Sequence, residues 1–252
     1  SNSFYFLYME EFMTLKNEDF DTIRKAPLMQ GLTSGDVKTA IDHFAVDVLV
    51  CSGMYSIYEL KKYSMIILEG FIDIVSITLN GDEHIVSRFS AGSYIPNGLM
   101  CSKSASSPFL PSVSKNCRIL VIDQEKIHHC NCNLFGNCID NCNQEYALSP
   151  LLLSRINYNM AVLLNDILIH LSEKLQIITQ KTLSEKLSSY FHILANKTGS
   201  SRFTLPFTRD ELAKYIFAER SSVSREINHM QNEQLIKLYS SKDIELLPST
   251  PT

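Results

Sequence analysis

The spacing of apolar residues changes along the chain, and each change predicts a different kind of element. Between residues 9 and 45 the apolar positions are interrupted at Pro27 to Gly31, which predicts two short helices. From Val46 onward, β-branched runs closed by turn residues predict short strands. These runs are VDVLV, SMIILEG, FIDIVSITLNG, HIVSRFSAG and RILVID. Short, evenly spaced strands with Gly turns predict a sandwich, jelly roll or barrel, which can enclose a ligand.

Beyond Pro150 the apolar spacing of three and four residues runs on without internal Gly or Pro, which predicts one long helix. A helix with so wide an apolar stripe must pack on the strand-rich part of its own chain, on the same helix of a partner, or on both. Asn165, Asp166 and His170 break the stripe, and we expect all three to face solvent. The stripe consists of Leu153, Ile156, Met160, Leu163, Leu164, Ile167, Leu171, Leu175 and Ile178.

A further helix is predicted from Thr182 to Asn196, with Thr182 as its cap and a loop over residues 197–201 after it. The inward positions of this helix are Leu183, Leu187, Phe191 and Leu194. We expect a hinge between Gln180 and Thr182, because a signal from the strand-rich part must reach the rest of the chain through the end of the long helix.

Residues 208–236 predict a pair of helices joined by a turn. Leu212, Ala213 and Ile216 face inward on the first helix, and Val223, Ile227 and Met230 do so on the second. The residues left outward at the start of the second helix are Arg220, Ser221, Ser222 and Arg225. Such a helix fits the major groove of DNA, where Arg bonds guanine bidentately and Ser bonds base edges or phosphate. A short LIKLYSSKDIELL then predicts a two-stranded wing that turns at Ser240 to Asp243.

Composition limits this interpretation. The 252 residues, of which 45% are hydrophobic, suffice for two domains, while the net charge is −4. Between residues 207 and 247 six basic side chains face seven acidic ones, so non-specific affinity for DNA should be weak and a dimer would be needed. The seven cysteines, and the lack of a leader or a long uncharged apolar run, predict a cytoplasmic protein with free thiols and no membrane association.

The string RSSVSRE with the wing after it resembles the C-terminal domain of Crp/Fnr-type bacterial transcription regulators. The stretch SMIILEGFIDIVSITLNGDEHIVSRFSAGSYI is similar to the cyclic-nucleotide-type β-roll of that family. The resemblance implies an α+β fold with a jelly-roll-like β-roll sensor domain (residues 1–148), a dimerisation helix (149–180) and a winged helix-turn-helix domain (181–252). It also implies a homodimer on double-stranded DNA, controlled by a small-molecule effector in the roll. The expected DNA-binding residues are Thr208, Arg209, Arg220, Ser221, Ser222 and Arg225.

Two positions depart from the family pattern in the helix pair. Phe217 stands where the turn usually has Gly, and since a bulky residue with positive φ is strained, we expect a remodelled turn. Ser221 stands where some members have an acid that accepts a hydrogen bond from cytosine. The operator sequence therefore does not follow from the resemblance.

The roll also departs from the family's cyclic nucleotide binders, which have a Gly-Glu pair and an Arg-Ser pair. The matching positions are Pro96-Asn97 and Ser107-Pro108, and Lys103 is the one cation between residues 99 and 114. A buried cyclic phosphate without a partner would cost several kcal/mol. We therefore expect an unidentified effector other than cyclic AMP; an apolar effector, or a roll that is only a scaffold, remain alternatives.

The segment IHHCNCNLFGNCIDNC, from Ile127 to Cys142, offers thiolates and imidazoles, which are ligands of zinc and iron-sulfur clusters. An alternative function is thus a redox or metal sensor that uses these cysteines, with a degenerate DNA-binding head serving protein contacts. The spacing is a poor match to paired C-x2-C units, so we expect no metal and no cofactor that the sequence identifies. The chain has no G-x-S-x-G, phosphate-binding Gly loop or H-E-x-x-H, and we expect no catalytic residue and no enzyme. The possible metal or redox ligands of the segment from Ile127 to Cys142 are His128, His129, Cys130, Cys132, Cys138 and Cys142.

Overall fold

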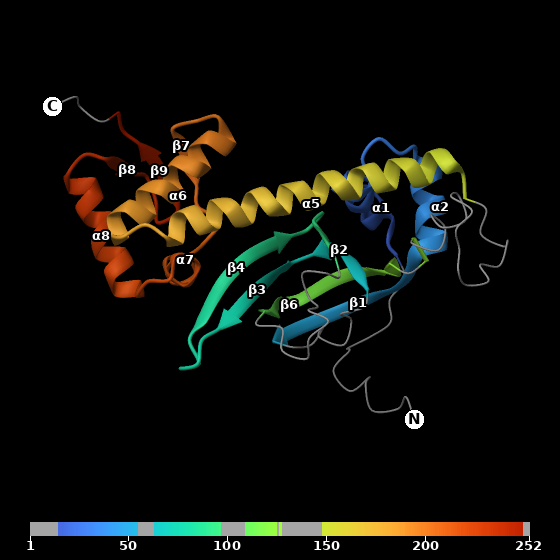
Figure 1. Cartoon of the computed structure of the whole chain (residues 1–252), viewed down its shortest axis with the longest axis horizontal. Coiled ribbons are helices and arrows are strands. Elements are labelled where there is room, and N and C mark those ends of the chain that lie inside the picture. Colours follow the sequence, from blue (N-terminus) through green and yellow to red (C-terminus); the bar gives the residue numbers. More distant parts are fainter. Residues whose placement is uncertain (1–14, 55–62, 97–108, 125, 128–147, 249–252) are drawn as a thin grey trace. The chain divides into compact units, whose positions relative to one another are not determined.

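The computed structural model of the chain describes residues 15–54, 63–96, 109–124, 126–127 and 148–248 (Figure 1). The chain divides into two compact units. The first comprises Ser1–Ile77 with Ser87–Asn165, and the second comprises Thr78–Val86 with Asp166–Thr252.

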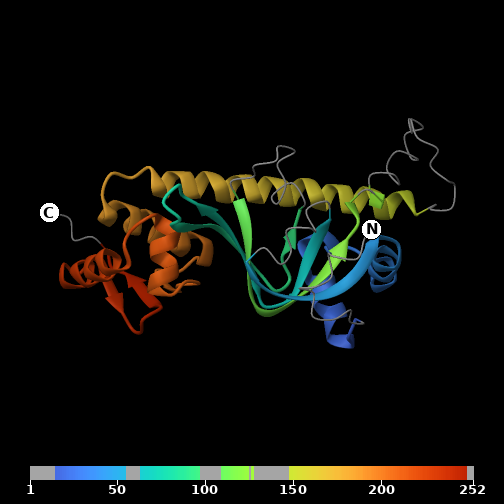
Figure 2. The same cartoon turned by 90° about the horizontal axis from the view of Figure 1, so that it is seen from below.

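The sheet of the first unit consists of antiparallel strands paired in the order β4-β3-β6-β2-β5, and β1 also pairs with β6. The long strand β6 has β1 along one edge, while β3 and then β2 pair with its other edge, and Figure 2 shows how the sheet curls. This is the expected roll. The strand bounds are β1 (Ala45–Met54), β2 (Ser64–Glu69), β3 (Phe71–Ile77), β4 (Glu83–Ser90), β5 (Tyr94–Ile95) and β6 (Phe109–Ile122).

Gly70 is the single residue between β2 and β3, at the point where the strand paired with β6 changes from β2 to β3. Gly70 has φ 84°, and a Cβ there would lie 2.6 Å from Ser114 Oγ and 3.2 Å from Cys117 Cα. Opposite this point β6 contains Asn116 with φ 55°, and the pairing of β1 with β6 shifts register in the same region. Gly is therefore required at position 70, because only a residue without a side chain allows β6 to approach so closely while φ is positive.

The helices α1 (Asn17–Lys25) and α2 (Ser34–Phe44), with the 3-10 turn η1 (Pro27–Met29) between them, confirm the two predicted N-terminal helices. Thr33 caps α2 by accepting a hydrogen bond from the Asp36 backbone N–H at 3.1 Å. The core of the unit combines apolar residues of these helices, the strands and the first half of α5 (Pro150–Ile178). Its members include Ile23, Val37, Phe44, Ile66, Leu120, Leu153 and Ile156.

A buried ion pair joins α1 to β6 in this unit. Arg118 Nη1 and Nη2 donate to Asp19 Oδ1 and Oδ2 at 2.9 and 2.7 Å. Burial raises the pKa of Asp19, but the hydrogen bonds from Arg118 and from the Lys16 backbone N–H outweigh it and hold that pKa below its usual value. Both charges are thus matched inside the fold.

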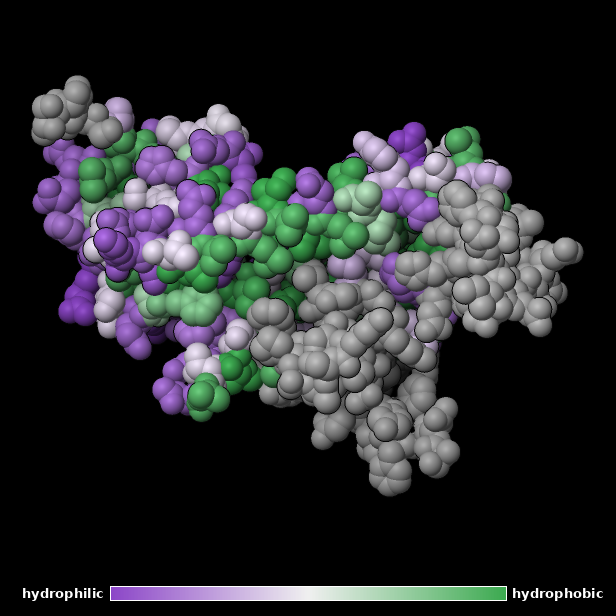
Figure 3. Space-filling model, in the orientation of Figure 1, coloured by the Kyte–Doolittle hydropathy of each residue, from purple (hydrophilic) through white to green (hydrophobic). Residues whose placement is uncertain are grey.

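The long helix α5 confirms the predicted helix, and its apolar stripe is buried at some positions and exposed at others. Leu153, Ile156 and Leu163 are buried in the first unit, whereas Leu164, Leu171 and Leu175 are exposed. Leu168, which the stripe did not include, is exposed as well, and Figure 3 shows hydrophobic side chains gathered along this helix. The stripe therefore serves its own core with one part and leaves another part uncovered.

Asn165 and Asp166 face solvent as expected, but the same prediction for His170 is wrong. The His170 side chain is 34% exposed, its Nε2 is buried without a hydrogen-bond partner among the described residues, and Nδ1 lies 3.9 Å from Glu173 Oε2. Burial lowers the pKa of His170. Helical spacing could not distinguish this position from its solvated neighbours.

The second unit contains the predicted helix pair and wing. Thr182 Oγ1 caps α6 by accepting from the Glu185 backbone N–H, and Gly199 ends the helix with φ 64°. The wing strands β8 and β9 pair as predicted, and a third strand, β7, joins them in the order β7-β9-β8. The bounds are α6 (Leu183–Thr198), β7 (Arg202–Thr204), α7 (Arg209–Ile216), α8 (Arg220–Asn232), β8 (Ile236–Leu238) and β9 (Asp243–Leu246).

An aromatic cluster forms much of the core of the second unit. Neighbouring rings have centroids between 4.8 and 6.5 Å apart and are tilted against one another. Its members are Tyr190, Phe191, Phe203, Phe207 and Tyr215. In the part of the chain that the structure describes, no helix is both long and apolar enough to cross a membrane.

Candidate nucleic-acid interface

Helix α8 has one fully buried face and one open face. Val223, Ile227 and Met230 are buried, as their spacing predicted. Arg220, Ser221 and Arg225 are exposed, and Ser222 is half-buried. The four residues predicted to bind DNA therefore lie in the first two turns of the helix, where a ligand can reach three of them fully and Ser222 in part.

The α8 N-terminus combines groups that attract an anion with one that opposes it. No acidic side chain lies in the first turn, but the exposed N-cap residue Glu219 is an acid and makes no side-chain cap hydrogen bond. The unpaired N–H groups at the start of a helix and its dipole both attract phosphate. Arg225 Nη2 donates to Ser222 Oγ at 3.3 Å, so Ser222 helps to orient the guanidinium of Arg225 along the open face.

Thr208 and Arg209 begin helix α7 and differ from the residues on α8. Thr208 Oγ1 accepts from the Glu211 backbone N–H at 3.3 Å, and Glu211 Oε2 accepts from the Thr208 backbone N–H at 2.7 Å. Arg209 is half-buried, its Nη1 lacks a hydrogen-bond partner among the described residues, and burial lowers its pKa. Thr208 thus caps the helix, and Arg209 is less open to a ligand than Arg220 or Arg225.

The turn between α7 and α8 is not remodelled, so that expectation is wrong. Phe217 takes the left-handed conformation, with φ 58° and ψ 58°, that the usual Gly would take. The Ala218 backbone N–H donates to Ala213 O at 3.0 Å, which closes the end of α7. The strain of a bulky residue at positive φ is therefore tolerated, and contacts of the Phe217 ring, described below, offset it.

Other exposed polar residues near this face were not foreseen. Asn228 and His229 are exposed on α8, and Asn228 follows Ser221 and Arg225 at seven and three residues, which places it on the same face. That spacing was visible in the sequence and could have included Asn228, since Asn pairs bidentately with adenine. On the wing sheet, Arg202 is occupied, because Nη2 donates to Asp243 Oδ2 at 3.1 Å and the guanidinium carbon lies 3.9 Å from the Tyr239 ring centroid.

Several predicted sites fall outside the described residues. These are Asn97, Lys103, Ser107 and Pro108 of the nucleotide comparison, and the segment from His128 to Cys142. Within the described residues no group of three or more His, Cys, Asp or Glu side chains is placed to hold a metal ion. The cysteine-based alternative thus stays a prediction.

Comparisons with known proteins agree with this architecture. Residues 185–248 match the family model of the Crp-like helix-turn-helix domain. A CooA variant from Carboxydothermus hydrogenoformans is similar in structure, with 13% identity, a TM-score of 0.59, and 82% of this chain and 85% of that chain covered. The c-di-GMP responsive global regulator CLP of Xanthomonas campestris is similar with 15% identity, a TM-score of 0.56, and 86% and 100% covered. No curated protein sequence matches the chain.

The curled sheet, the long helix and the helix pair followed by its wing define the class of the fold. Its C-terminal part is a Crp-like helix-turn-helix domain, and the chain has the fold of the Crp/Fnr-type regulators. The resemblance noted in the sequence and the expected fold class are confirmed. The matched domain is not that of an enzyme family, in agreement with the prediction that the chain is no enzyme.

Proposed function

We propose that the protein is a Crp/Fnr-type transcription regulator that binds a two-fold symmetric operator as a homodimer and responds to an effector other than cyclic AMP. In this proposal residues 1–148 receive the effector, 149–180 dimerise and 181–252 bind DNA in the cytoplasm. The observation that carries it is the open face of α8, with Arg220, Ser221 and Arg225 over a buried apolar face, inside a segment that matches a Crp-like helix-turn-helix domain.

The uncovered face of α5 supports the homodimer. Leu164, Leu168, Leu171 and Leu175 follow one another at four, three and four residues, which is the a/d spacing of a coiled coil. Their exposed fractions are 51, 64, 37 and 58%. Four leucines in a row on one helix face form the kind of contiguous apolar patch that marks an interface, and the same helix of a second copy matches it.

The described arginines of the roll support an effector without a cyclic phosphate. Arg88 Nε and Nη2 donate to Asp73 Oδ1 and Oδ2, both at 2.7 Å, and Arg118 is held by Asp19. Each guanidinium in the described strands of this sheet is therefore matched by a carboxylate of the same chain. Among the described strands, a buried phosphate would have to break such a pair to obtain a guanidinium as its charge partner.

The DNA-binding proposal is tested by selecting duplexes from a random pool with the full-length protein and measuring affinity by fluorescence anisotropy. Arg220→Ala and Arg225→Ala should each weaken binding of the selected duplex by roughly 5- to 150-fold, as loss of a base contact worth about 1–3 kcal/mol implies. Arg24→Ala, which removes an exposed Arg of α1, is the matched control and should bind as the wild type does. Failure to enrich any duplex, or equal affinity in all four proteins, would refute the proposal.

Dimerisation is tested separately by sedimentation velocity at micromolar concentration. We expect the wild type to sediment as a dimer and Leu168→Glu as a monomer, because the variant would bury a charge in the interface between the two α5 helices. Leu79→Glu changes a fully exposed leucine outside the proposed α5 interface and should leave the dimer intact. A monomeric wild type that still binds its selected duplex would contradict the homodimer.

Calorimetry addresses the effector. Titration of cyclic AMP into the protein should give no saturable heat in the micromolar range, and a saturable isotherm with micromolar Kd would overturn that part of the proposal.

A further inference from the structure

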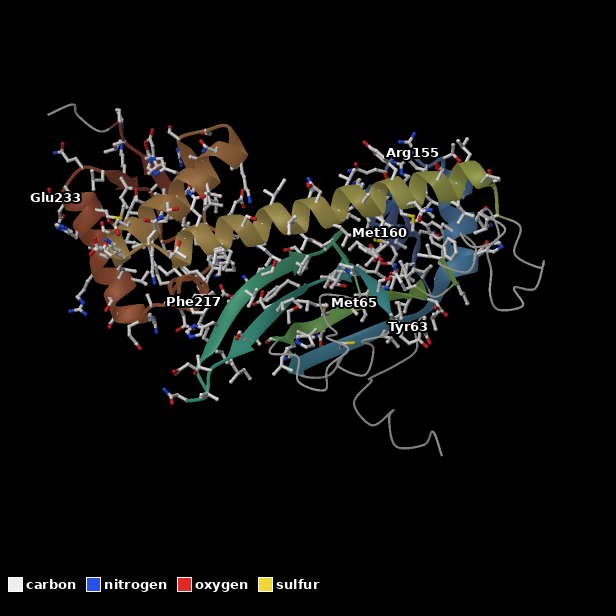
Figure 4. The ribbon with its side chains drawn as sticks, viewed as in Figure 1. Tyr63, Met65, Arg155, Met160, Phe217 and Glu233 are labelled. Carbon is white, nitrogen blue, oxygen red and sulfur yellow. The ribbon has the colours of Figure 1, made fainter. Side chains whose placement is uncertain are left out.

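Phe217 holds a backbone conformation that its side chain makes costly. A non-Gly residue at positive φ is destabilised by about 1–2 kcal/mol, and Gly would avoid this cost. The turn between α7 and α8 keeps its closing hydrogen bond, from the Ala218 backbone N–H to Ala213 O. The conformational strain therefore belongs to the Phe217 backbone and not to a distorted turn. We therefore ask which contacts of the Phe217 ring, which is labelled in Figure 4, offset this cost.

One contact of the ring is with a short turn far away in the sequence, which we call the hairpin tip (residues 78–86). The rings of Phe217 and His84 have centroids 4.2 Å apart and an interplanar angle of 31°. The tip is itself well ordered by hydrogen bonds, because the Thr78 backbone N–H donates to Asp82 O at 2.9 Å and the Gly81 backbone N–H donates to Thr78 O at 3.0 Å. Both segments belong to the second unit.

The second contact is a buried lysine of α5. Lys174 is 4% exposed, and its Nζ donates to Ile85 O in the hairpin tip at 2.9 Å and to Tyr215 O at the end of α7. The same nitrogen lies 3.3 Å from the ring centroid of Tyr215 and 5.1 Å from that of Phe217. One amino group therefore joins the backbone of the hairpin tip to the backbone that leads into the turn.

Two further lysines surround this contact. Lys186 Nζ donates to Ile216 O at 3.4 Å, so the last two carbonyls of α7 each receive a hydrogen bond from a lysine. Lys214 Nζ lies 3.3 Å from Glu83 Oε2, a second link between α7 and the hairpin tip, but this pair is partly exposed. Exposed ion pairs contribute little, so Lys174 and the ring pair are the main links.

We propose that Phe217, His84 and Lys174 form an intramolecular latch that couples the hairpin tip energetically to the turn before the recognition helix α8. Phe217 replaces Gly because its ring closes this latch. Coupling of this kind is reciprocal: a ligand that changes the hairpin tip changes DNA binding, and DNA bound to α8 changes the hairpin tip. This regulatory role rests on the proposed DNA-binding function, whereas the latch itself can be tested without DNA.

The first experiment is hydrogen exchange on the full-length protein in the absence of DNA. In Phe217→Gly and in His84→Ala, the amides of residues 78–86 should exchange about tenfold faster than in the wild type, while those of α7 and α8 stay within twofold, because Gly suits the turn and His84 lies outside it. Leu79→Ala, a fully exposed change in the same tip, should leave exchange at 81–86 unchanged. Unchanged exchange of the tip in both latch variants would overturn the latch.

The second experiment adds a saturating amount of the duplex selected by the wild type. Exchange at residues 78–86 should change at least threefold in the wild type, and by less than half as much in Phe217→Gly and His84→Ala at equal occupancy. If the three side chains only pack together and do not couple the hairpin tip to DNA binding, exchange at residues 78–86 of the wild type should not change when the duplex is added. That result would refute the regulatory role. If no duplex is selected, the DNA-binding proposal fails, while the first experiment still decides whether the latch exists.

Discussion

At the scale of single residues, the buried pair of Asp19 and Arg118 illustrates a contact that stability depends on. The two residues are 99 positions apart in the chain. Removing one partner leaves a buried charge without compensation, so Asp19→Asn should lower the free energy of unfolding by about 3–5 kcal/mol, measured with urea. In Asp19→Leu/Arg118→Met both charges are absent, and we expect a loss smaller than the sum of the two single changes; additive losses would contradict this.

The pH dependence of the same pair follows from the direction of the Asp19 shift. Because the pKa of Asp19 is lower in the folded protein than in the unfolded chain, its stabilising contribution is present above the unfolded value of about 3.9. The contribution is lost as pH falls through the folded pKa. Asp19→Asn should therefore lose less stability than the wild type on acidification from pH 5.

Lys174 titrates in the opposite sense. Burial, and then the like charge of Lys186, lower the pKa of Lys174 from 10.5 to about 6. Between about pH 6 and 10 the unfolded chain holds a proton that the folded protein has released, so stability from this group rises with pH, by at most about 1.4 kcal/mol per pH unit. The free energy of unfolding of the wild type, minus that of Lys174→Met at each pH, measures this contribution, because the facing groups His84, Lys186, Lys214, Glu83 and Tyr215 are the same in both proteins. A difference that does not vary with pH would contradict it.

Sequence reasoning could not reach these residue pairs. Patterns of three and four residues report which face of an element is apolar, but they carry no information on which distant side chain lies opposite. His170 was expected in solvent for the same reason, and Lys174 drew no attention on a stripe defined by its apolar members. The partners of Lys174, Ile85 O and Tyr215 O, come from other elements.

At the scale of elements, the first turn of α7 allows the capping role of Thr208 to be separated from its predicted contact with DNA. Thr208→Ala should lower the free energy of unfolding by about 1 kcal/mol, because the capping hydrogen bond to Glu211 is lost. Thr208→Asp keeps a good cap and should keep the stability, but its charge opposes a nearby phosphate. Chemical denaturation and anisotropy on the selected duplex give the two readouts.

The two variants then distinguish the roles. If Thr208 contacts DNA, Thr208→Asp should bind more weakly than Thr208→Ala although it is the more stable protein. The reverse order would leave Thr208 with the capping role alone.

The elements themselves were well predicted where periodicity was strong. The bounds of α5, the inward residues of α7 and α8, and the wing strands agree with their patterns. Strand β6 was recognised only from Arg118 onward, since Pro111 and the polar residues after it hide the first half of a 14-residue strand. Strand β7 is three residues long and was missed, because so short a strand is defined by its partner β9 rather than by its own pattern.

At the scale of the whole molecule, net charge and dimerisation determine how binding depends on salt. With a net charge of −4, the protein must obtain its affinity from a few local phosphate contacts, doubled by the second copy. The slope of log K against log salt should therefore be about twice as steep for the wild type on a full two-fold symmetric duplex as for Leu168→Glu on a half-site. Anisotropy titrations from 50 to 200 mM salt test this, and equal slopes would argue against two recognition helices binding together.

The sequence by itself determined the order of the helices and of the longer strands, the buried faces of α7 and α8, and the outward position of Arg220 and Arg225, because local spacing alone specifies which side of an element is apolar. The tertiary structure decided the rest. It pairs β6 with three strands, buries Asp19 against Arg118, leaves part of the α5 stripe exposed, and brings His84 and Lys174 to Phe217. These features depend on contacts between distant segments, whose free energy is realised only when the chain is folded.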